Sequence, residues 1–304
     1  MKHTTSRHWK GLIISAFLSF ASCMAYAAPP PTLKFCTGGV GGFYEGLGTS
    51  IGGKITNDIG NTLKVVTTGG SVDNARKLKS GDCDIAIIQA DAVITQPMPS
   101  SFKAINAHEE VVYWLFPKGG AVEDFGDMED DKVMKKYAFA TVKGSGAAVT
   151  LNNWIKTDKD YAGAVPVEFK DWYSAAEAVA QGFTMDSGVR VDIAGMLYIG
   201  RLGMLPADIT SDFGSQIVVG EVNDDSFAGA KDANGNDLYT QCKIPKGKTS
   251  GLERSNSMSD QNTYCLRAQV VFNNAYLAGL DEAETTTVRR AVDKGINSTV
   301  KVVR

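Results

Sequence analysis

The chain has 304 residues, of which 43% are hydrophobic and 21% are charged, a composition typical of globular proteins with one or two domains. Its formal net charge is −3, and removal of residues 1–27, which carry three cations and no acid, changes it to −6. This charge argues against a nucleic acid or another polyanion as a partner.

The N-terminus predicts a secretory signal peptide. Three cations precede the apolar run 11–20, and the small-x-small sequence at 25–27 is typical of a cleavage site. The apolar run is shorter than the ~20 residues that span a bilayer. We therefore expect cleavage after residue 27 and release into the periplasm. The alternative is lipidation at Cys23, for which Phe20 is a poor match.

Short apolar segments alternate with helical ones in the first part of the chain. The predicted strands are 33–36, 63–68 and 84–89, and the helices between them are 44–57 and 72–80. This order is typical of right-handed parallel units in an α/β sheet. Open α/β sheets bind ligands beyond the carboxyl ends of their strands.

A second alternation follows the strand predicted at 109–116. It predicts another α/β lobe, with strands at 137–142, 165–170 and 189–196, a helix opening at 144–146 and a helix at 172–181.

The last third begins with a polar stretch, 224–259, which we interpret as surface hairpins and loops. A strand is predicted at 264–272. Asp281 and Glu284 form a capping box for the final helix, which should dock through an apolar stripe at helical spacing, namely Val288, Ala291, Val292 and Ile296.

Glycine-rich turns link strands to helices at 37–48, 67–74 and 144–146. Such a turn leaves backbone N–H groups uncovered at the positive end of a helix dipole, where they can hold a carboxylate or phosphate. The alternative for any one turn is that its glycines only allow a tight connection between strand and helix and bind no ligand. Together they predict a small-anion site made of Gly38, Gly39, Gly41, Gly42, Gly69, Gly70, Ser71, Gly144, Ser145 and Gly146. Trp172, at a strand-to-helix junction, is a candidate to stack on the ligand.

The sequence offers few catalytic groups. Beyond residue 27 the one histidine is His108, at the start of a predicted strand, where a structural role is favoured over a catalytic triad or a metal ligand. No serine lies in a G-x-S-x-G motif, and no nucleotide-binding loop is complete. We expect no enzyme activity, no cofactor and no metal site.

Four cysteines remain beyond residue 27. Cys242 and Cys265 flank a polar loop of 22 residues, and we predict a disulfide there, worth roughly 3 kcal/mol. Cys36 and Cys83 lie at opposite ends of strands predicted to be parallel neighbours. We therefore expect these two to be separate thiols, with Cys36 buried as a small hydrophobe.

Segments 33–48, 67–93 and 137–155 resemble the TAXI-type solute-binding proteins of tripartite ATP-independent periplasmic (TRAP) transporters, and the likeness covers 33–203 well and the rest loosely. It implies a two-lobed α/β protein of the type II, Venus-flytrap kind, with mixed sheets and a ligand cleft between lobes. Lobe 1 would comprise 28–116 and 270–304, and lobe 2 would comprise 117–269. The resemblance further implies a monomer that delivers a small carboxylate solute, an amino acid or organic acid, to a TRAP permease.

By the same resemblance the ligand turns fall on Gly38 to Tyr44, on Gly69 to Ser71 with Asn74, on Gln89 and Asp91, and on Gly144 to Gly146. Asn74, Gln89 and Asp91 would bind the other polar groups of the ligand, and Tyr44 or Trp172 would cover its apolar part.

Several residues depart from the family pattern, and these departures argue against a glutamate-like ligand. They are Phe43, Glu45 and Gly46 in the first turn, and Lys143, Ala147 and Ala148 around the third.

Two other functions fit the sequence less well. One is a sensing module that keeps the lobes and signals to a membrane partner. The other is an exported hydrolase, which would have to use His108.

Overall fold

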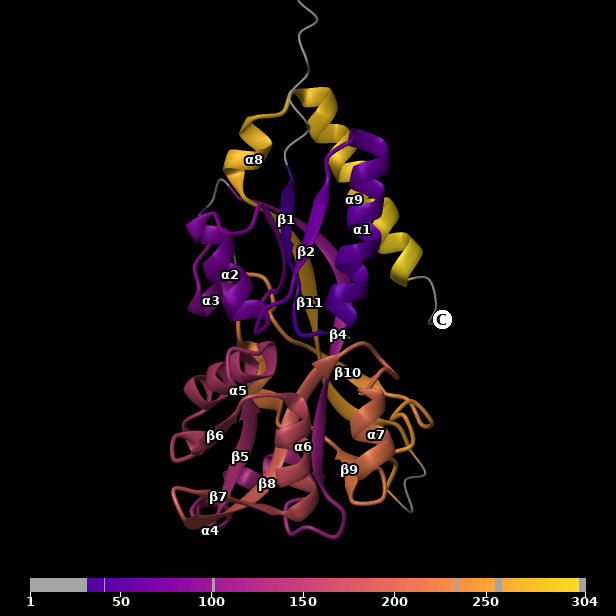
Figure 1. Ribbon diagram of the computed structural model, residues 1–304. Coiled ribbons are helices and arrows are strands. Elements are labelled where there is room, and N and C mark those ends of the chain that lie inside the picture. Colours follow the sequence, from indigo (N-terminus) through magenta and orange to yellow (C-terminus); the bar gives the residue numbers. More distant parts are fainter. Residues whose placement is uncertain (1–31, 41, 100–101, 233–234, 255–258, 301–304) are drawn as a thin grey trace, which may run out of the picture. The chain divides into compact units, whose positions relative to one another are not determined.

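A mixed β-sheet is the frame of the molecule (Figure 1). The computed structural model describes residues 32–40, 42–99, 102–232, 235–254 and 259–300. Within them the main path of strands runs β2-β1-β3-β11-β4-β8-β5-β6, and β10, β7 and β9 pair with β11, β8 and β4. The predicted signal peptide and Cys23 lie outside the described residues.

The first lobe contains the parallel units that the sequence predicted. Strand β1 pairs in parallel with both β2 and β3. The elements are β1 (Leu33–Cys36), α1 (Phe43–Ile59), β2 (Leu63–Val66), α2 (Ser71–Ser80), β3 (Ile85–Gln89), α3 (Ala92–Thr95), α8 (Asn274–Ala278) and α9 (Glu282–Val300).

Helices cover both faces of this part of the sheet. Alternate residues of β3 point to opposite faces, so Ile85 and Ile87 join one buried cluster while Ala86 and Ile88 join another. The first cluster includes the predicted stripe of α9, and α9 lies beside α1 (Figure 1). The predicted capping box is present, because the backbone N–H groups of Asp281 and Glu284 each donate to the other side chain.

The second lobe repeats the arrangement of strands backed by helices. Strand β5 pairs in parallel with β6 and with β8. Its elements are η1 (Phe125–Glu129), α4 (Asp131–Met134), β5 (Tyr137–Val142), α5 (Gly146–Thr157), η2 (Lys159–Tyr161), β6 (Pro166–Phe169), α6 (Trp172–Gln181), β7 (Phe183–Asp186), β8 (Val189–Gly200), α7 (Ala207–Phe213), β9 (Ile217–Gly220) and η3 (Asp225–Gly229). The hairpin partner β7 was not predicted.

Two long strands run through both lobes. Strand β4 (Lys103–Pro117) pairs antiparallel with β11 (Gln261–Phe272) up to Val111, and with β8 and β9 from Val111 onward. Strand β11 also pairs with β3 and with β10 (Thr240–Ile244). The two-lobed mixed α/β fold is thus confirmed, and the lobe limits given above, at 116 and 270, stay a prediction.

The prediction of separate thiols at Cys36 and Cys83 is wrong, because the two form a disulfide with Cα atoms 6.0 Å apart. Strand β1 has only four residues, and the turn before β3 folds against it, with the Asp84 N–H donating to Lys34 O. The C-terminal end of β1, with Cys36, and the turn before β3, with Cys83, are therefore close in space. The predicted pair Cys242 and Cys265 is confirmed, with Cα atoms 5.8 Å apart on neighbouring strands β10 and β11.

The interpretation of 224–259 as surface hairpins and loops is only partly right. The stretch contains β10, and Tyr239 is buried against Trp154, with ring centroids 5.6 Å apart. Its polar composition hides two aromatic residues, Phe227 and Tyr239, that belong to the core of the second lobe.

Candidate functional site

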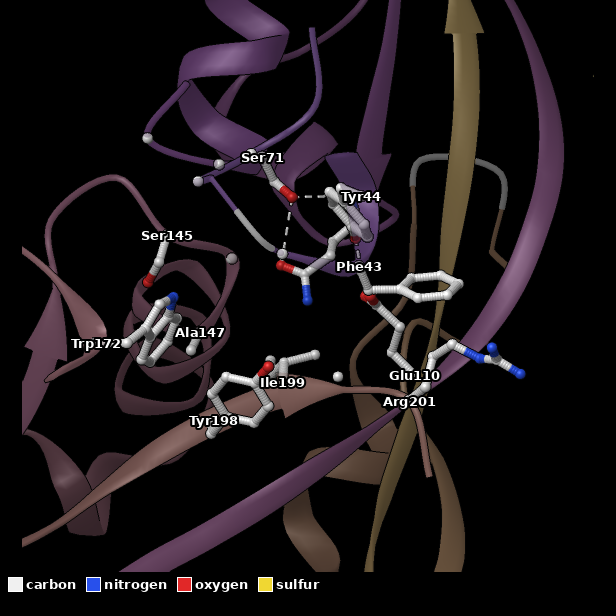
Figure 2. Close-up of a pocket in the computed structure, with 18 of the residues that line it drawn as sticks. Phe43, Tyr44, Ser71, Glu110, Ser145, Ala147, Trp172, Tyr198, Ile199 and Arg201 are labelled. Atoms are coloured by element: carbon white, nitrogen blue, oxygen red, sulfur yellow. Dashed lines mark hydrogen bonds between the residues drawn. The ribbon is translucent and has the colours of Figure 1, made fainter. Parts of the chain in front are cut away.

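A cavity of about 130 Å³ lies where the two lobes meet, lined from the first lobe by the glycine turns and from the second by α5, α6 and the end of β8 (Figure 2). At the ~30 Å³ that each water takes up in the liquid, it has room for about four water molecules. Of the predicted ligand residues, the lining includes Gly38, Gly39, Gly42, Tyr44, Gly69, Gly70, Ser71, Gln89, Ser145, Gly146 and Trp172.

The N-termini of three helices converge on the cavity wall. Helices α1 and α2 begin after Gly42 and Gly70, and neither glycine offers a side chain to cap the first turn. Helix α5 begins after Ser145, whose Oγ accepts from the Ala148 N–H. The first N–H groups of a helix have no partner within the helix, so the three ends give the cavity a positive potential.

The second glycine turn is held by its own hydrogen bonds. The Gly69 N–H donates to the Asp73 carboxylate (3.3 Å), and the Gly70 N–H donates to Thr68 Oγ1 (3.2 Å). Ser71 Oγ accepts from the Gln89 N–H at 3.1 Å. Two of the N–H groups expected to hold an anion are thus occupied, and the first turn of α2 supplies the donors nearest to them.

Glu110, Tyr44 and His108 form a buried polar group at one side of the cavity. The Tyr44 hydroxyl donates to Glu110 Oε2 (3.0 Å), and His108 Nε2 lies 3.2 Å from Glu110 Oε1. Burial, and then the neighbouring Glu110 charge, raise the pKa of Tyr44 well above its ordinary value. The His108 ring also packs edge-on against Phe43. His108 is a buried partner of an acid at the cavity wall.

The end of β8 forms the floor of the cavity with Tyr198, Ile199, Gly200 and Arg201. Burial raises the pKa of Tyr198 above its ordinary value, and the Glu110 charge adds to this effect. The Arg201 guanidinium lies 4.8 Å from the Phe43 ring centroid and donates to Thr299 O at 3.4 Å. Burial lowers the pKa of Arg201.

Trp172 and Met204 supply apolar surface. The Trp172 ring is half-buried and meets the Tyr198 ring edge-on at 5.0 Å. Met204 is partly exposed at the cavity, and both residues also line an adjoining hollow with Val40 and Pro206. The site therefore combines helix N-termini, an acid and an apolar wall.

Two predicted ligand residues lie outside the lining and hold the fold instead. The Asn74 amide, fully buried, donates to Thr37 O and to Ile87 O. Asp91, also fully buried, accepts from the hydroxyls of Thr150 and Tyr239. These bonds tie α2 to β1 and β3, and tie the end of β3 to α5.

The remaining predicted residues are Gly144 and Gly41. Gly144, with φ of +73°, shapes the turn before α5 but does not line the cavity. Gly41 falls outside the described residues.

Sequence reasoning missed Glu110, Tyr198 and Arg201. Strand pairing explains why, since Val111 lies opposite Gly200 in the antiparallel register of β4 and β8. The next positions along, Glu110 and Arg201, are thereby brought to the cavity from residues far apart in the chain. No local motif marks them.

The described residues contain neither a candidate metal site nor a helix suited to cross a membrane. No group of three or more histidine, cysteine or acidic side chains is placed to hold a metal ion there. Of the helices in that same part of the chain, none has the length and apolar character that a membrane crossing needs.

The fold and the cavity define a two-lobed α/β protein with a small-molecule-sized site between its lobes. Residues 35–178, just under half of the chain, match the NMT1-like family. No curated protein sequence matches the chain.

The solved structures that are similar to this chain are about 10% identical to it in sequence. The GluR0 ligand-binding core from Nostoc punctiforme, in complex with L-glutamate, is 10% identical over 88% of this chain and 97% of that one, with a TM-score of 0.48. The Bordetella pertussis BvgS periplasmic VFT2 domain is 9% identical over 90% and 93%, with a TM-score of 0.46. HinK, a LysR family transcriptional regulator from Pseudomonas aeruginosa, is 11% identical over 92% and 74%, with a TM-score of 0.46. At such values nothing follows about the ligand of this chain.

Proposed function

We propose that the protein is an extracytoplasmic receptor that closes its lobes around a small carboxylate-bearing solute and delivers it to a TRAP-type membrane permease. The observation that carries this proposal is the convergence of the N-termini of α1, α2 and α5, from both lobes, on one cavity. An anion bound there is stabilised by both lobes at once, so binding favours the closed arrangement.

The size and lining of the cavity support a small solute. A cavity of about 150 Å³ can hold a molecule the size of benzene, so a volume of about 130 Å³ suits a solute with somewhat more than five non-hydrogen atoms, on the order of six. Trp172 and Tyr198 would cover its apolar part, while Ser71 and Ser145 would hydrogen bond its anionic group.

The two disulfides support an oxidising compartment, because such bonds persist in the periplasm and rarely in the cytosol. Binding without conversion is part of the proposal. The His108 side chain is 1% exposed, and its Nε2 lies against Glu110. In this position it is poorly placed to reach a serine nucleophile.

Native mass spectrometry of protein purified without denaturation, followed by thermal unfolding with amino acids, dicarboxylates and 2-oxo acids, tests the receptor role. A ligand at 100 times its Kd stabilises by about 2.7 kcal/mol, which raises Tm by several degrees. Ser71→Ala should reduce that rise, and Ser80→Ala, an exposed serine at the far end of α2, should not. The proposal would be contradicted if no compound of the panel raised Tm and native mass spectrometry showed no bound ligand.

The transport step needs its own experiment. Cells that lack this protein should lose uptake of the identified ligand and regain it with the intact gene. If cells without this protein still took up the ligand, the protein would be a binding protein that serves a partner other than the permease.

A further inference from the structure

Glu110 is an acid in an unusual place. It lies on β4, its side chain is 4% exposed, and yet it lines the ligand cavity. The preceding residue, Glu109, is exposed, because successive residues of a strand point to opposite faces. The strand thus directs one carboxylate into the site and the other to solvent.

The partners of Glu110 leave its charge without a cationic side chain. Among the described residues, its hydrogen bonds come from Tyr44 Oη and His108 Nε2, and no lysine or arginine nitrogen lies within 4.0 Å of it. Within the same residues, His108 Nδ1 is buried and has no hydrogen-bond partner. A hydrogen on Nε2 alone therefore satisfies the ring best, and it donates to Glu110.

Two hydrogen bonds leave about half of the acceptor positions of a carboxylate open. A buried acid is costly unless it is paired, and Glu110 is a buried acid that belongs to the lining of a cavity. Arg201, at the next register position, turns its guanidinium towards Phe43 and Thr299 (Figure 2). The group that completes the pair is then expected to arrive with the ligand.

Glu110 and the N-terminus of α5 lie on opposite sides of the cavity, and Ser71 lies between them beside Tyr44 (Figure 2). In Figure 2, Glu110 and Phe43 lie on one side, and Ser145 and Trp172 lie on the other, with Ser71 above them. Ser71 and Ser145 mark the N-termini of α2 and α5, which favour an anion. A ligand that spans the cavity meets an anion site at one end and a carboxylate at the other.

We propose that Glu110 binds a cationic nitrogen of the ligand, and that the solute is therefore a zwitterion of amino acid size rather than an organic acid without an amine. This inference rests on the receptor role proposed above. The anionic group of the zwitterion lies at the ends of α2 and α5, and the ammonium donates to the open oxygen positions of Glu110. A dicarboxylate or 2-oxo acid places no donor there, and a second carboxylate would be repelled.

Calorimetry with matched pairs tests this on the unaltered protein at pH 7.5. The pairs are L-alanine and pyruvate, L-leucine and 4-methyl-2-oxopentanoate, and L-glutamate and 2-oxoglutarate. We expect at least one amino acid to bind 10-fold or more tightly than its 2-oxo partner, since a charge-assisted hydrogen bond is lost with the amine. Binding of 2-oxo acids as tightly as the amino acids, or more so, would overturn the role of Glu110 and leave the receptor standing.

Glu110→Gln keeps the shape of the side chain and removes its charge, and Glu109→Gln is the matched control on the exposed face of the same strand. We expect Glu110→Gln to weaken amino acid binding by on the order of 10- to 100-fold while 2-oxo acid binding holds or improves. Equal losses for both series would contradict the proposal. If Glu110→Gln does not fold, the matched pairs on the unaltered protein decide alone. If neither series binds, the role of Glu110 fails, and the receptor role is decided separately by native mass spectrometry and the wider panel of compounds.

Discussion

Gly70 and Ser145, from the glycine turns of opposite lobes, lie backbone against backbone. A Cβ added at Gly70 would stand 3.3 Å from the Ser145 Cα and 3.4 Å from Gly144 O. The N-termini of α2 and α5 can share one cavity because nothing larger than hydrogen separates these two turns. Gly70 also has φ of +116°, a conformation that residues with a Cβ rarely adopt.

Gly70→Ala should therefore impair lobe closure as well as folding. The strained φ lowers the stability of the fold by about 1–3 kcal/mol in either arrangement, and the added methyl group presses on the Gly144–Ser145 backbone only when the lobes are together. We expect ligand affinity to fall by at least 10-fold in calorimetry. Gly53→Ala is the control, because that glycine is exposed on α1 with no atom within 4 Å of the added Cβ. Equal affinities for the two variants would show that the turns do not need this contact.

The disulfide between Cys36 and Cys83 should stabilise the protein at least as much as the one between Cys242 and Cys265. It joins residues 47 apart, against 23 for the other, and chain-entropy arguments give about 4 and about 3 kcal/mol. Urea unfolding of the two double alanine variants would measure both. A much smaller loss for the first pair would mean that the unfolded chain keeps β1 and β3 close.

Strands such as β3 and β5 were predictable because they are buried on both faces and read as short apolar runs between helices, whereas the more exposed hairpin strand β7 was not. The cavity was predictable in part, since glycines before a helix mark its N-terminus wherever the chain folds. Glu110 could not be found in this way, because its position depends on the register of β4 against β8. The position of Asp91 outside the cavity lining has a similar reason, since its partner Tyr239 lies 148 residues further on.

The capping box at the start of α9 offers a local test of stability. Asp281 Oδ1 accepts from the Glu284 N–H at 2.7 Å, and α9 packs on α1 through Val288 and Val292. Asp281→Ala should lower the free energy of unfolding by about 1 kcal/mol. Asp293→Ala, an exposed site within the same helix, should have a smaller effect. Hydrogen exchange in the first turn of α9 should be faster in Asp281→Ala than in Asp293→Ala. Similar exchange rates in the two variants would show that the cap does not stabilise the helix.

Asp91 should make stability depend on pH. Burial raises its pKa from 3.8 to about 6, and the hydrogen bonds from Thr150 and Tyr239 only partly offset this. The folded protein therefore holds the proton more tightly than the unfolded chain. The stability that Asp91 contributes is complete below about pH 4 and is lost as pH rises through about 6. A shift of about two units corresponds to about 3 kcal/mol.

The measurement is urea unfolding of the unaltered protein and of Asp91→Asn between pH 4 and pH 7.5. Asparagine cannot titrate, so the difference between the two free energies of unfolding isolates Asp91 from the other acids. We expect the unaltered protein to lose about 2 kcal/mol relative to Asp91→Asn as pH rises from 4 to 7. Asp82→Asn, at an exposed site between α2 and β3, is the matched control. A difference that stays constant with pH would mean that Asp91 titrates alike in the folded and unfolded chains.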